Sequence, residues 1–294
     1  MQTRQLGPFT VSAIGLGAMP FSMSGKALPS REQAIATVHA ALDAGITFID
    51  TSDIYAPTWD TMGHNEEIIA AALASWSGDR DAIVVGTKAG IVRGEGETWR
   101  RDASPEYLRV AVEKALKILG VEAIDLLQWH RPDRSRTYAE GIQAFADLKA
   151  EGKIKAVGVS NANVEELDIA LEVLGEGGLA SVQNQFSPKF RGAPDVELTW
   201  CADHGVAFLP WSPLGGTSGG AAAVGQNFPA IAAAAENHGV SPQQVVLAWE
   251  LAKGDHVIPI PGASRPETIV DSAKAADLVL TEEEFAAIDH RPGW

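Results

Sequence analysis

Short apolar runs rich in β-branched residues alternate with longer segments of helical periodicity along most of the chain. Runs of this kind predict buried strands, and the longer segments predict helices. The predicted strands are Ile14–Leu16, Thr47–Asp50, Ala82–Thr87, Ile124–Trp129, Ile154–Val159, Ser181–Asn184, Val206–Pro210 and Val257–Ile260. The predicted helices include Glu32–Ala44, Glu66–Ser75, Pro105–Leu119, Tyr138–Ala150 and Val164–Leu174.

Signals for helix termini support several of these helices. Ser104 precedes Pro105 and Ser241 precedes Pro242, which is the usual order of an N-cap followed by a proline in the first turn. Glycines suited to a helix C-terminus follow three predicted helices, at Gly45, Gly120 and Gly152. These signals place several helix ends independently of the apolar pattern.

Eight strands that alternate with helices in 294 residues predict a single α/β domain over residues 1–294, the (β/α)8 or TIM barrel. An open doubly wound sheet is the alternative, and it would place a glycine fingerprint between a strand and a helix. The best candidate, Gly15-Leu16-Gly17, is followed by no helix start before Pro29, so the barrel is favoured. A hairpin around Phe9–Val11 is expected to close the floor of the barrel.

Composition and charge exclude several classes of partner. Hydrophobic residues make up 46% of the chain and charged residues 21%, as in soluble globular proteins. A formal net charge of −15 without a Lys/Arg cluster argues against nucleic-acid binding, although a local basic pocket could still hold one phosphate. No run approaches the ~18 apolar residues of a membrane span, so no membrane partner is expected.

The single cysteine and the first residues bear on location. Cys201 has no partner for an internal disulfide, and Met1–Thr10 lacks the layout of a secretory signal. A reducing cytoplasm is therefore the expected location. A monomer is the default expectation for the oligomeric state.

Polar residues gather where the predicted strands end, while the interiors of the strands stay apolar. In a (β/α)8 barrel the C-terminal ends of the strands meet at one pole, where active sites lie. Three neighbouring strand ends contribute four ionisable side chains, Asp50, Tyr55, Lys88 and His130. One pole of the barrel is therefore predicted to be a catalytic site.

These four side chains suit the reduction of a carbonyl group, which needs a hydride donor and a proton for the developing alkoxide. Tyr55 can supply the proton if its pKa is drawn below the usual ~10 for tyrosine. A Lys88 ammonium would favour the phenolate, and Asp50 would hold the lysine charged and in place. His130 can donate a hydrogen bond to the substrate oxygen and polarise it.

At these positions the sequence resembles the aldo-keto reductase superfamily, in its bacterial-type members, over nearly the whole chain. The motifs that carry the resemblance are Asp50–Tyr55, Gly86–Lys88, Trp129-His130, Gly158–Asn161, Gln183–Ser187, Pro210–Leu214 and Ile258–Arg265. The resemblance implies an NADP(H)-dependent oxidoreductase that reduces aldehydes or ketones to alcohols. It also implies that Tyr55 is the general acid, that Lys88 paired with Asp50 tunes it, and that His130 orients the carbonyl.

The resemblance further implies an extended cofactor site. The nicotinamide carboxamide would be held by Ser160, Asn161 and Gln183, and the ring would stack on Trp211. The pyrophosphate would lie along Ser212, Pro213, Leu214 and Gly215, and the adenine end would meet Gly262, Ala263, Ser264, Arg265 and Asp271. Arg265 is the expected partner of a 2′-phosphate, because a guanidinium can grip phosphate through two parallel hydrogen bonds. NADP(H) is therefore expected, and no metal.

The sequence departs from the family pattern at three places. Asp271 and Ser272 stand where members often carry a Glu-Asn pair, and Thr268 stands where some carry an arginine. Contacts to the adenine and the 2′-phosphate are then fewer, so use of NAD(H) stays open. The segment Ala56–Asp60 replaces the commoner glycine after the tyrosine and is expected to shape the substrate pocket.

Two other functions stay open at this point. One is a non-catalytic, redox-sensing NADP-binding partner subunit on the same fold, which the four intact catalytic positions disfavour. The other is a metal-dependent hydrolase, which would need several converging histidine and carboxylate ligands, whereas only His130 lies at a predicted strand end.

The identity of the carbonyl substrate also stays open, because it depends on the loops at the mouth of the barrel. The predicted loops are Ala56–Gly63, Ile91–Ala103, Gly215–Asn227, with Gly215–Val224 expected to be flexible, and the C-terminal tail. Positive charge near the mouth, from Arg93, Arg100 and Arg101 beside Trp99, hints at an anionic or polar substrate.

Overall fold

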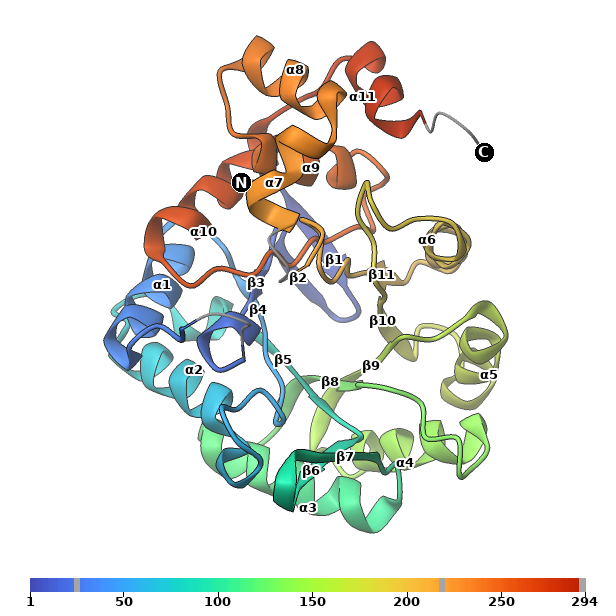
Figure 1. Ribbon diagram of the computed structural model, residues 1–294. Helices are drawn as coiled ribbons and strands as arrows, with labels where there is room; N and C mark the ends of the chain where they lie inside the picture. The colour runs from blue at the N-terminus through green and yellow to red at the C-terminus, as the bar shows by residue number, and fades with distance from the viewer. Residues whose placement is uncertain (24–26, 217–219, 291–294) are drawn as a thin grey trace.

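Parallel strands form a curved sheet with helices around it in the computed structural model (Figure 1), which describes residues 1–23, 27–216 and 220–290. The sheet has seven strands in the order β11-β10-β9-β8-β5-β4-β3. Their bounds are β3 Leu16–Gly17, β4 Phe48–Asp50, β5 Val84–Ala89, β8 Ile124–Trp129, β9 Ile154–Ser160, β10 Leu179–Gln183 and β11 Ala207–Phe208. Seven of the eight predicted strands are thus present, with ends that differ by a few residues.

The eighth predicted strand, Val257–Ile260, is an extended segment that does not form a regular strand. Its backbone bridges Val257 to Phe208 of β11, and the adjoining Gly262 bridges to Gly17 of β3. Pro259 and Pro261 have no N–H to donate, so only their carbonyls take part, accepting from Gly15 and Gly17 at 2.9 and 3.0 Å. These bonds join the two edges of the sheet, as in a (β/α)8 barrel.

An antiparallel hairpin of β1 (Thr3–Leu6) and β2 (Phe9–Ser12) precedes the sheet. Its turn contains Gly7, whose φ of +55° suits glycine. A Cβ atom at Gly7 would lie 2.6 Å from that of Ala180 in β10, so the turn packs directly against the sheet. Leu6 is fully buried in the same cluster as the strand side chains.

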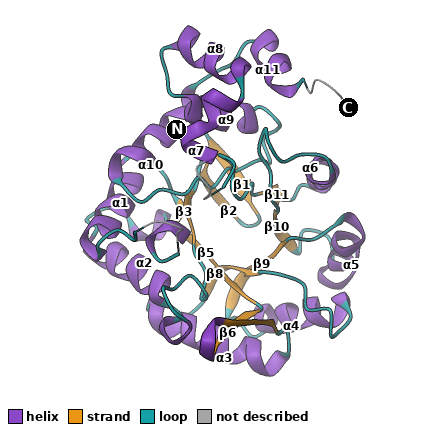
Figure 2. Ribbon diagram, viewed as in Figure 1, coloured by secondary structure: helices purple, strands orange, loops and turns teal. Residues whose placement is uncertain are grey.

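Helices lie on the outside of the strands (Figure 2). They are α1 Arg31–Asp43, α2 His64–Ser75, α3 Pro105–Leu119, α4 Tyr138–Ala150, α5 Val164–Leu174, α6 Ala193–His204, α7 Gly220–Asn227, α8 Pro229–His238, α9 Pro242–Leu251, α10 Pro266–Ala273 and α11 Glu282–Asp289. The two predicted N-caps are confirmed, because the hydroxyls of Ser104 and Ser241 accept from the backbone N–H groups of Tyr107 and Gln244. None of the described helices has the length and apolarity needed to cross a bilayer.

Two predicted loops contain regular structure. Ile91–Ala103 holds a second hairpin, β6 (Ile91–Gly94) with β7 (Thr98–Arg101), whose turn includes Gly96 at a φ of +72°. Within Gly215–Val224, helix α7 begins at Gly220, and residues 217–219 lie outside the described residues. The run of alanines after Gly220 favours a helix over the predicted flexible loop.

The alternation of side chains along the strands positions the site. In β4, Phe48 points into the apolar cluster inside the barrel, so Asp50, two residues on, faces the same interior nearer the C-terminal end. Gln128 likewise lies two residues after Leu126 in β8, and Lys88 lies four residues after Val84 in β5, so both share the inward-facing side of their strands. The barrel interior is therefore apolar along the earlier residues of its strands and polar at their C-terminal ends.

Candidate active site

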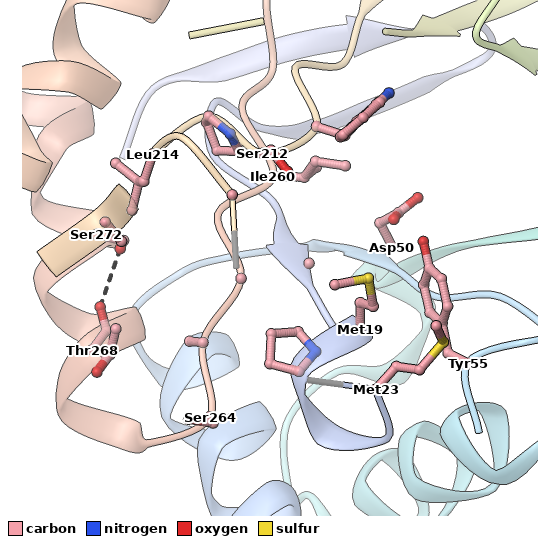
Figure 3. A pocket seen from close by; sticks show the side chains of 18 of the residues that line it. Met19, Met23, Asp50, Tyr55, Ser212, Leu214, Ile260, Ser264, Thr268 and Ser272 are labelled. Atoms are coloured by element: carbon pink, nitrogen blue, oxygen red, sulfur yellow. Dashed lines mark hydrogen bonds between the residues drawn. The ribbon is translucent and has the colours of Figure 1, made fainter. Parts of the chain in front are cut away.

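A cavity of about 840 Å³ opens at the C-terminal ends of the strands. This volume lies within the usual range for small-molecule sites. Figure 3 shows Asp50 and Tyr55 with Met19 and Met23 in one part of the cavity, and Thr268 in another. The predicted site residues that line it are Asp50, Tyr55, His130, Ser160, Asn161, Gln183, Trp211, Ser212, Pro213, Leu214, Gly262, Ala263, Ser264, Arg265 and Asp271.

Two predicted residues do not line this cavity. Lys88 belongs to β5, which continues to Ala89, and not to the loop after it. Its Nζ contacts Tyr55 Oη, and Tyr55 in turn lines the cavity. Gly215 faces another, smaller hollow, and Gly216 takes its place in the cavity wall. Both glycines have a φ close to +86°, a conformation that favours glycine.

The Lys88 ammonium uses all of its N–H groups inside the protein. Its Nζ donates to Asp50 Oδ2 at 2.6 Å, to the carbonyl oxygen of Thr51 at 2.8 Å and to Tyr55 Oη at 3.3 Å. Since an ammonium has three donors, none remains for another ligand. Tyr55 Oη is an acceptor in this network, so its own hydrogen is left to point into the cavity.

The second oxygen of Asp50 is also engaged. The amide nitrogens of Gln183 and Gln128 donate to Asp50 Oδ1 at 2.8 and 3.0 Å, and Gln183 also donates to Gln128 Oε1. Buried carboxylates are stable only when hydrogen-bonded or paired. Two strand-end glutamines and one lysine therefore fix Asp50 in the barrel interior.

Burial and neighbouring charge act in opposite directions on the pKa values of Lys88 and Tyr55. Burial lowers the pKa of the Lys88 ammonium, but Asp50 and Tyr55 oppose this, and the net pKa lies above its usual value. Burial raises the pKa of Tyr55, and the opposing Lys88 charge does not reverse the increase. The prediction that Lys88 draws the tyrosine pKa below 10 is therefore wrong for this network, because desolvation of the phenolate is the larger effect.

His130 lies beside Tyr55, with the two rings edge to face and their centroids 5.8 Å apart. Its Nδ1 is 3.2 Å from Ser52 Oγ. Burial, together with the positive charges of Lys88 and Arg131, lowers the pKa of His130 well below its usual value. The ring is therefore a neutral imidazole at neutral pH, with one N–H and one acceptor nitrogen.

Asn161 has a left-handed backbone, with a φ of +60°, directly after β9. Its side-chain nitrogen donates to the carbonyl oxygen of His130 at 3.1 Å and to Ser160 Oγ at 2.9 Å. Its backbone N–H donates to the carbonyl oxygen of Gln183. Among the described residues none donates to the amide oxygen of Asn161 or of Gln183, so the cavity wall offers two acceptors here.

The loop after β11 forms another wall of the cavity. Trp211 is half-buried against the apolar interior of the barrel. Ser212, the next residue, has a φ of +54°. Backbone strain of this kind often occurs where a ligand is held.

The far part of the cavity carries charge from α10. Arg265, at the N-terminus of this helix, is mostly exposed and lies 3.2 Å from Glu267 Oε1. Both carboxylate oxygens of Asp271 are occupied by Ser241 Oγ and Gln244 Nε2 at 2.6 Å. Asp271 therefore orders the cavity wall and has less capacity to bind a ligand, whereas the Arg265 guanidinium remains accessible.

The arginines of the second hairpin mostly serve other contacts. Buried Arg93 donates to the carbonyl oxygens of Ile54 and Ala56 and pairs with Glu97. Arg100 pairs with Asp102, and Arg101 donates to the carbonyl oxygen of Pro132. Among the predicted mouth residues of this hairpin, Trp99 lines the cavity.

Several lining residues were not predicted from the sequence. They are Gly17, Met19, Pro20, Met23, Ala27, Arg131, Gln243 and Glu267. Arg131 was within reach of sequence reasoning, because it directly follows His130 at a strand end. Met19 and Met23 gave no signal, since apolar residues after a strand are as common in cores as in pockets.

Comparisons with known proteins place the chain among oxidoreductases. The model of the Aldo/keto reductase family matches residues 13–291. The 6-dehydroglucose reductase of Novosphingobium aromaticivorans is 32% identical over 292 residues, covering 97% of this chain and 93% of the relative. The pyridoxine 4-dehydrogenase of Escherichia coli is 30% identical over 296 residues, covering 98% and 97%. The crystal structure of an aldo/keto reductase from Klebsiella pneumoniae in complex with NADP and acetate is 31% identical, with a TM-score of 0.80 and coverage of 98% and 94%.

Proposed function

Because this chain belongs to the aldo/keto reductase family, we propose that it reduces aldehydes or ketones to alcohols with NADPH, and that Tyr55 supplies the proton. The observation that carries the proposal is the saturated Lys88 ammonium. It donates one hydrogen bond to Tyr55 Oη and leaves the phenolic hydrogen directed into the cavity. A carbonyl oxygen at that point receives the hydrogen.

The cavity lining fits an elongated dinucleotide. The free amide oxygens of Asn161 and Gln183 suit the two N–H groups of a carboxamide, and Trp211 offers an aromatic face beside them. Arg265, in the part of the cavity formed by α10, suits a 2′-phosphate. The Klebsiella relative, crystallised with NADP, supports the same assignment. Bound NADPH would supply the hydride, and the side chains would hold it and manage the proton.

The raised pKa of Tyr55 means that the phenol is protonated at neutral pH. At neutral pH the phenol keeps its hydrogen until the carbonyl oxygen develops negative charge. The Lys88 ammonium then stabilises the phenolate that forms, because the two atoms are already in contact. His130 adds a hydrogen-bond donor to the same oxygen if its cavity-facing nitrogen carries the hydrogen.

Replacing Tyr55 by phenylalanine tests the proposal, since it removes the donor and keeps the ring. We expect kcat/KM for aldehydes to fall roughly 10²–10⁴-fold, the usual contribution of a general acid. The dissociation constant for NADPH, measured by fluorescence titration, should change little. Turnover is followed by NADPH absorbance with a panel of aldehydes and ketones. Near-normal turnover by Y55F, or no turnover of any carbonyl by the wild type despite tight NADPH binding, would refute the proposal.

We also infer that the whole chain is one barrel domain whose floor is closed by the β1–β2 hairpin. Leu6 and Val11 of the hairpin pack in one cluster with Phe48 and Leu126 from the strands. The hairpin thus covers the interior at the end opposite the polar ends of the strands.

A further inference from the structure

A chain of hydrogen-bonded polar side chains, Ser52, Asp53 and Tyr107, connects to Nδ1 of His130 and has no part in the proposed function so far. Ser52 Oγ lies 3.2 Å from His130 Nδ1 and 3.2 Å from Asp53 Oδ1. Tyr107 of α3 donates to Asp53 Oδ2 at 3.2 Å and also lies 3.0 Å from the carbonyl oxygen of Ile91. His130 is thereby connected through one hydroxyl to a buried carboxyl group.

The Ser52 hydroxyl has one hydrogen to give and two neighbours that could accept it. If Asp53 is ionised, the serine donates to the carboxylate and accepts the Nδ1 hydrogen of His130. If Asp53 is protonated, it donates to Ser52, and the serine in turn donates to Nδ1. The Ile54 N–H, 3.4 Å from Ser52 Oγ, is accepted in both arrangements.

The two arrangements differ in whether the Nε2 atom of His130 presents a lone pair or a hydrogen to the cavity. In the first, Nε2 of a neutral His130 has a lone pair and cannot donate to a carbonyl oxygen. In the second, Nε2 carries the hydrogen and can donate. The Tyr107 hydroxyl has one hydrogen for two acceptors, Asp53 Oδ2 and the carbonyl oxygen of Ile91. When it donates to Asp53 Oδ2, an acid proton is directed to Oδ1, the oxygen that faces Ser52.

We propose that Asp53 is a positioning residue that, in its protonated form, acts through the Ser52 hydroxyl to hold His130 as the Nε2–H tautomer. This inference rests on the proposed carbonyl reduction, in which His130 donates to the substrate oxygen. Asp53 itself is not among the residues that line the cavity. It sets which nitrogen of His130 carries the hydrogen.

The surroundings of Asp53 favour the protonated form near neutrality. Burial, and then the nearby Glu66 carboxylate of α2, raise the pKa of Asp53 to about 8. The hydroxyls of Ser52 and Tyr107 lower it, but by less. Tyr55 and Tyr107 are titratable groups that sense the charge of Asp53.

The consequence is a loss of activity on the alkaline side. As the pH rises through the pKa of Asp53, the carboxylate takes the Ser52 hydrogen and His130 adopts the Nδ1–H tautomer. No proton is added to or removed from His130 itself, because its own pKa lies well below neutral. Reduction should therefore slow with the loss of one proton from Asp53.

The Asp53→Asn variant provides the test, because its amide N–H can donate permanently to Ser52 and does not titrate. We expect the wild-type kcat/KM for an aldehyde to fall about tenfold per pH unit above the pKa of Asp53. D53N should lack this alkaline decrease. The matched control is Glu66→Gln, which removes a neighbouring buried carboxylate and should move the decrease to lower pH without abolishing it.

The tautomer can be observed directly by ¹⁵N NMR of histidine-labelled protein, with His130 assigned from a His130→Gln variant. We expect wild-type His130 to change from Nε2–H to Nδ1–H as Asp53 ionises, and to remain Nε2–H in D53N. Y55F should keep the change of tautomer while losing turnover, so failure of the proposed reaction is separable from failure of this inference. The same His130 tautomer in the wild type at all pH values, or an alkaline decrease retained in D53N, would overturn it.

Discussion

At the scale of single residues, Arg265 is the group on which the choice of cofactor depends. Its guanidinium is mostly exposed, lines the cavity and, among the residues that the structure describes, pairs only with Glu267. An exposed ion pair of this kind contributes little and is readily exchanged for a phosphate. The extra phosphate is the only chemical difference between NADPH and NADH, so this residue can be tested selectively.

Replacing Arg265 by alanine should weaken NADPH binding by roughly tenfold to a hundredfold, the usual effect of losing a charge-assisted hydrogen bond. The dissociation constant for NADH, measured by the same fluorescence titration, should change by less than about twofold. Arg100→Ala serves as the control, because that arginine pairs with Asp102 outside the cavity lining. Equal losses for both cofactors in R265A would show that Arg265 does not contact the 2′-phosphate.

The residues of the proposed catalytic set could be singled out from the sequence because each lies at or near the end of an apolar strand. Asp50, Lys88 and His130 follow such runs directly. The direction of the Tyr55 pKa could not be predicted, because it depends on how completely the phenol is buried. The contact between Asp53 and Tyr107 was also beyond reach, since 54 residues separate them and neither type is unusual alone.

At the scale of the elements, helix α9 contains a feature that opposes stability. Glu250 is fully buried, and neither carboxylate oxygen has a hydrogen-bond partner among the described residues. Burial raises the pKa of Glu250 well above 4.5, so the folded protein holds this carboxyl group neutral. In the unfolded chain the same group ionises above its ordinary pKa.

This difference predicts how stability depends on pH. Because the folded pKa is the raised one, the contribution of Glu250 is present below pH 4.5 and is lost as the pH rises, by about 1.4 kcal/mol per pH unit until the folded pKa is reached. Glu250→Met should remove this dependence and raise the free energy of unfolding at neutral pH by roughly 1–3 kcal/mol. Chemical denaturation across pH measures both effects, with exposed Glu236→Gln of α8 as the control. A parallel pH profile in E250M would contradict the account.

The predicted elements were most accurate where local pattern and tertiary context agree. Helices α3, α4 and α5 begin and end at the predicted residues, because apolar periodicity and terminal signals coincide there. The hairpin within Ile91–Ala103 was missed, since its second strand, Thr98–Arg101, is exposed and has no alternating pattern. The strand at Val257–Ile260 was over-predicted, because two prolines interrupt its bonding.

At the scale of the whole molecule, we expect one end of the barrel to serve the reaction and the other to stabilise the fold. The polar groups lie at the C-terminal ends of the strands, and the β1–β2 hairpin packs against the apolar part of the interior. Changes at the apolar end should therefore affect stability and not turnover.

Leu6→Ala tests this separation, since the leucine is fully buried in the hairpin. We expect a loss of roughly 2–5 kcal/mol in the free energy of unfolding, the usual cost of such a cavity. The kcat/KM, measured where the variant is still folded, should stay within about twofold of the wild type. Val110→Ala, at an exposed site on α3, is the control and should change stability by less than about 0.5 kcal/mol. A large loss of turnover in folded L6A would refute the division between the two ends.

The proline-interrupted segment has a consequence for the ring of strands as a closed structure. Its bonds to Gly15, Gly17 and Phe208 join the two edges of the sheet at this point. The cavity is lined on both sides of this junction, by Gly17 near the start of the chain and by Gly262 near its end. A molecule bound there would contact both β3 and this last extended segment, so its binding free energy would also stabilise the closure of the barrel.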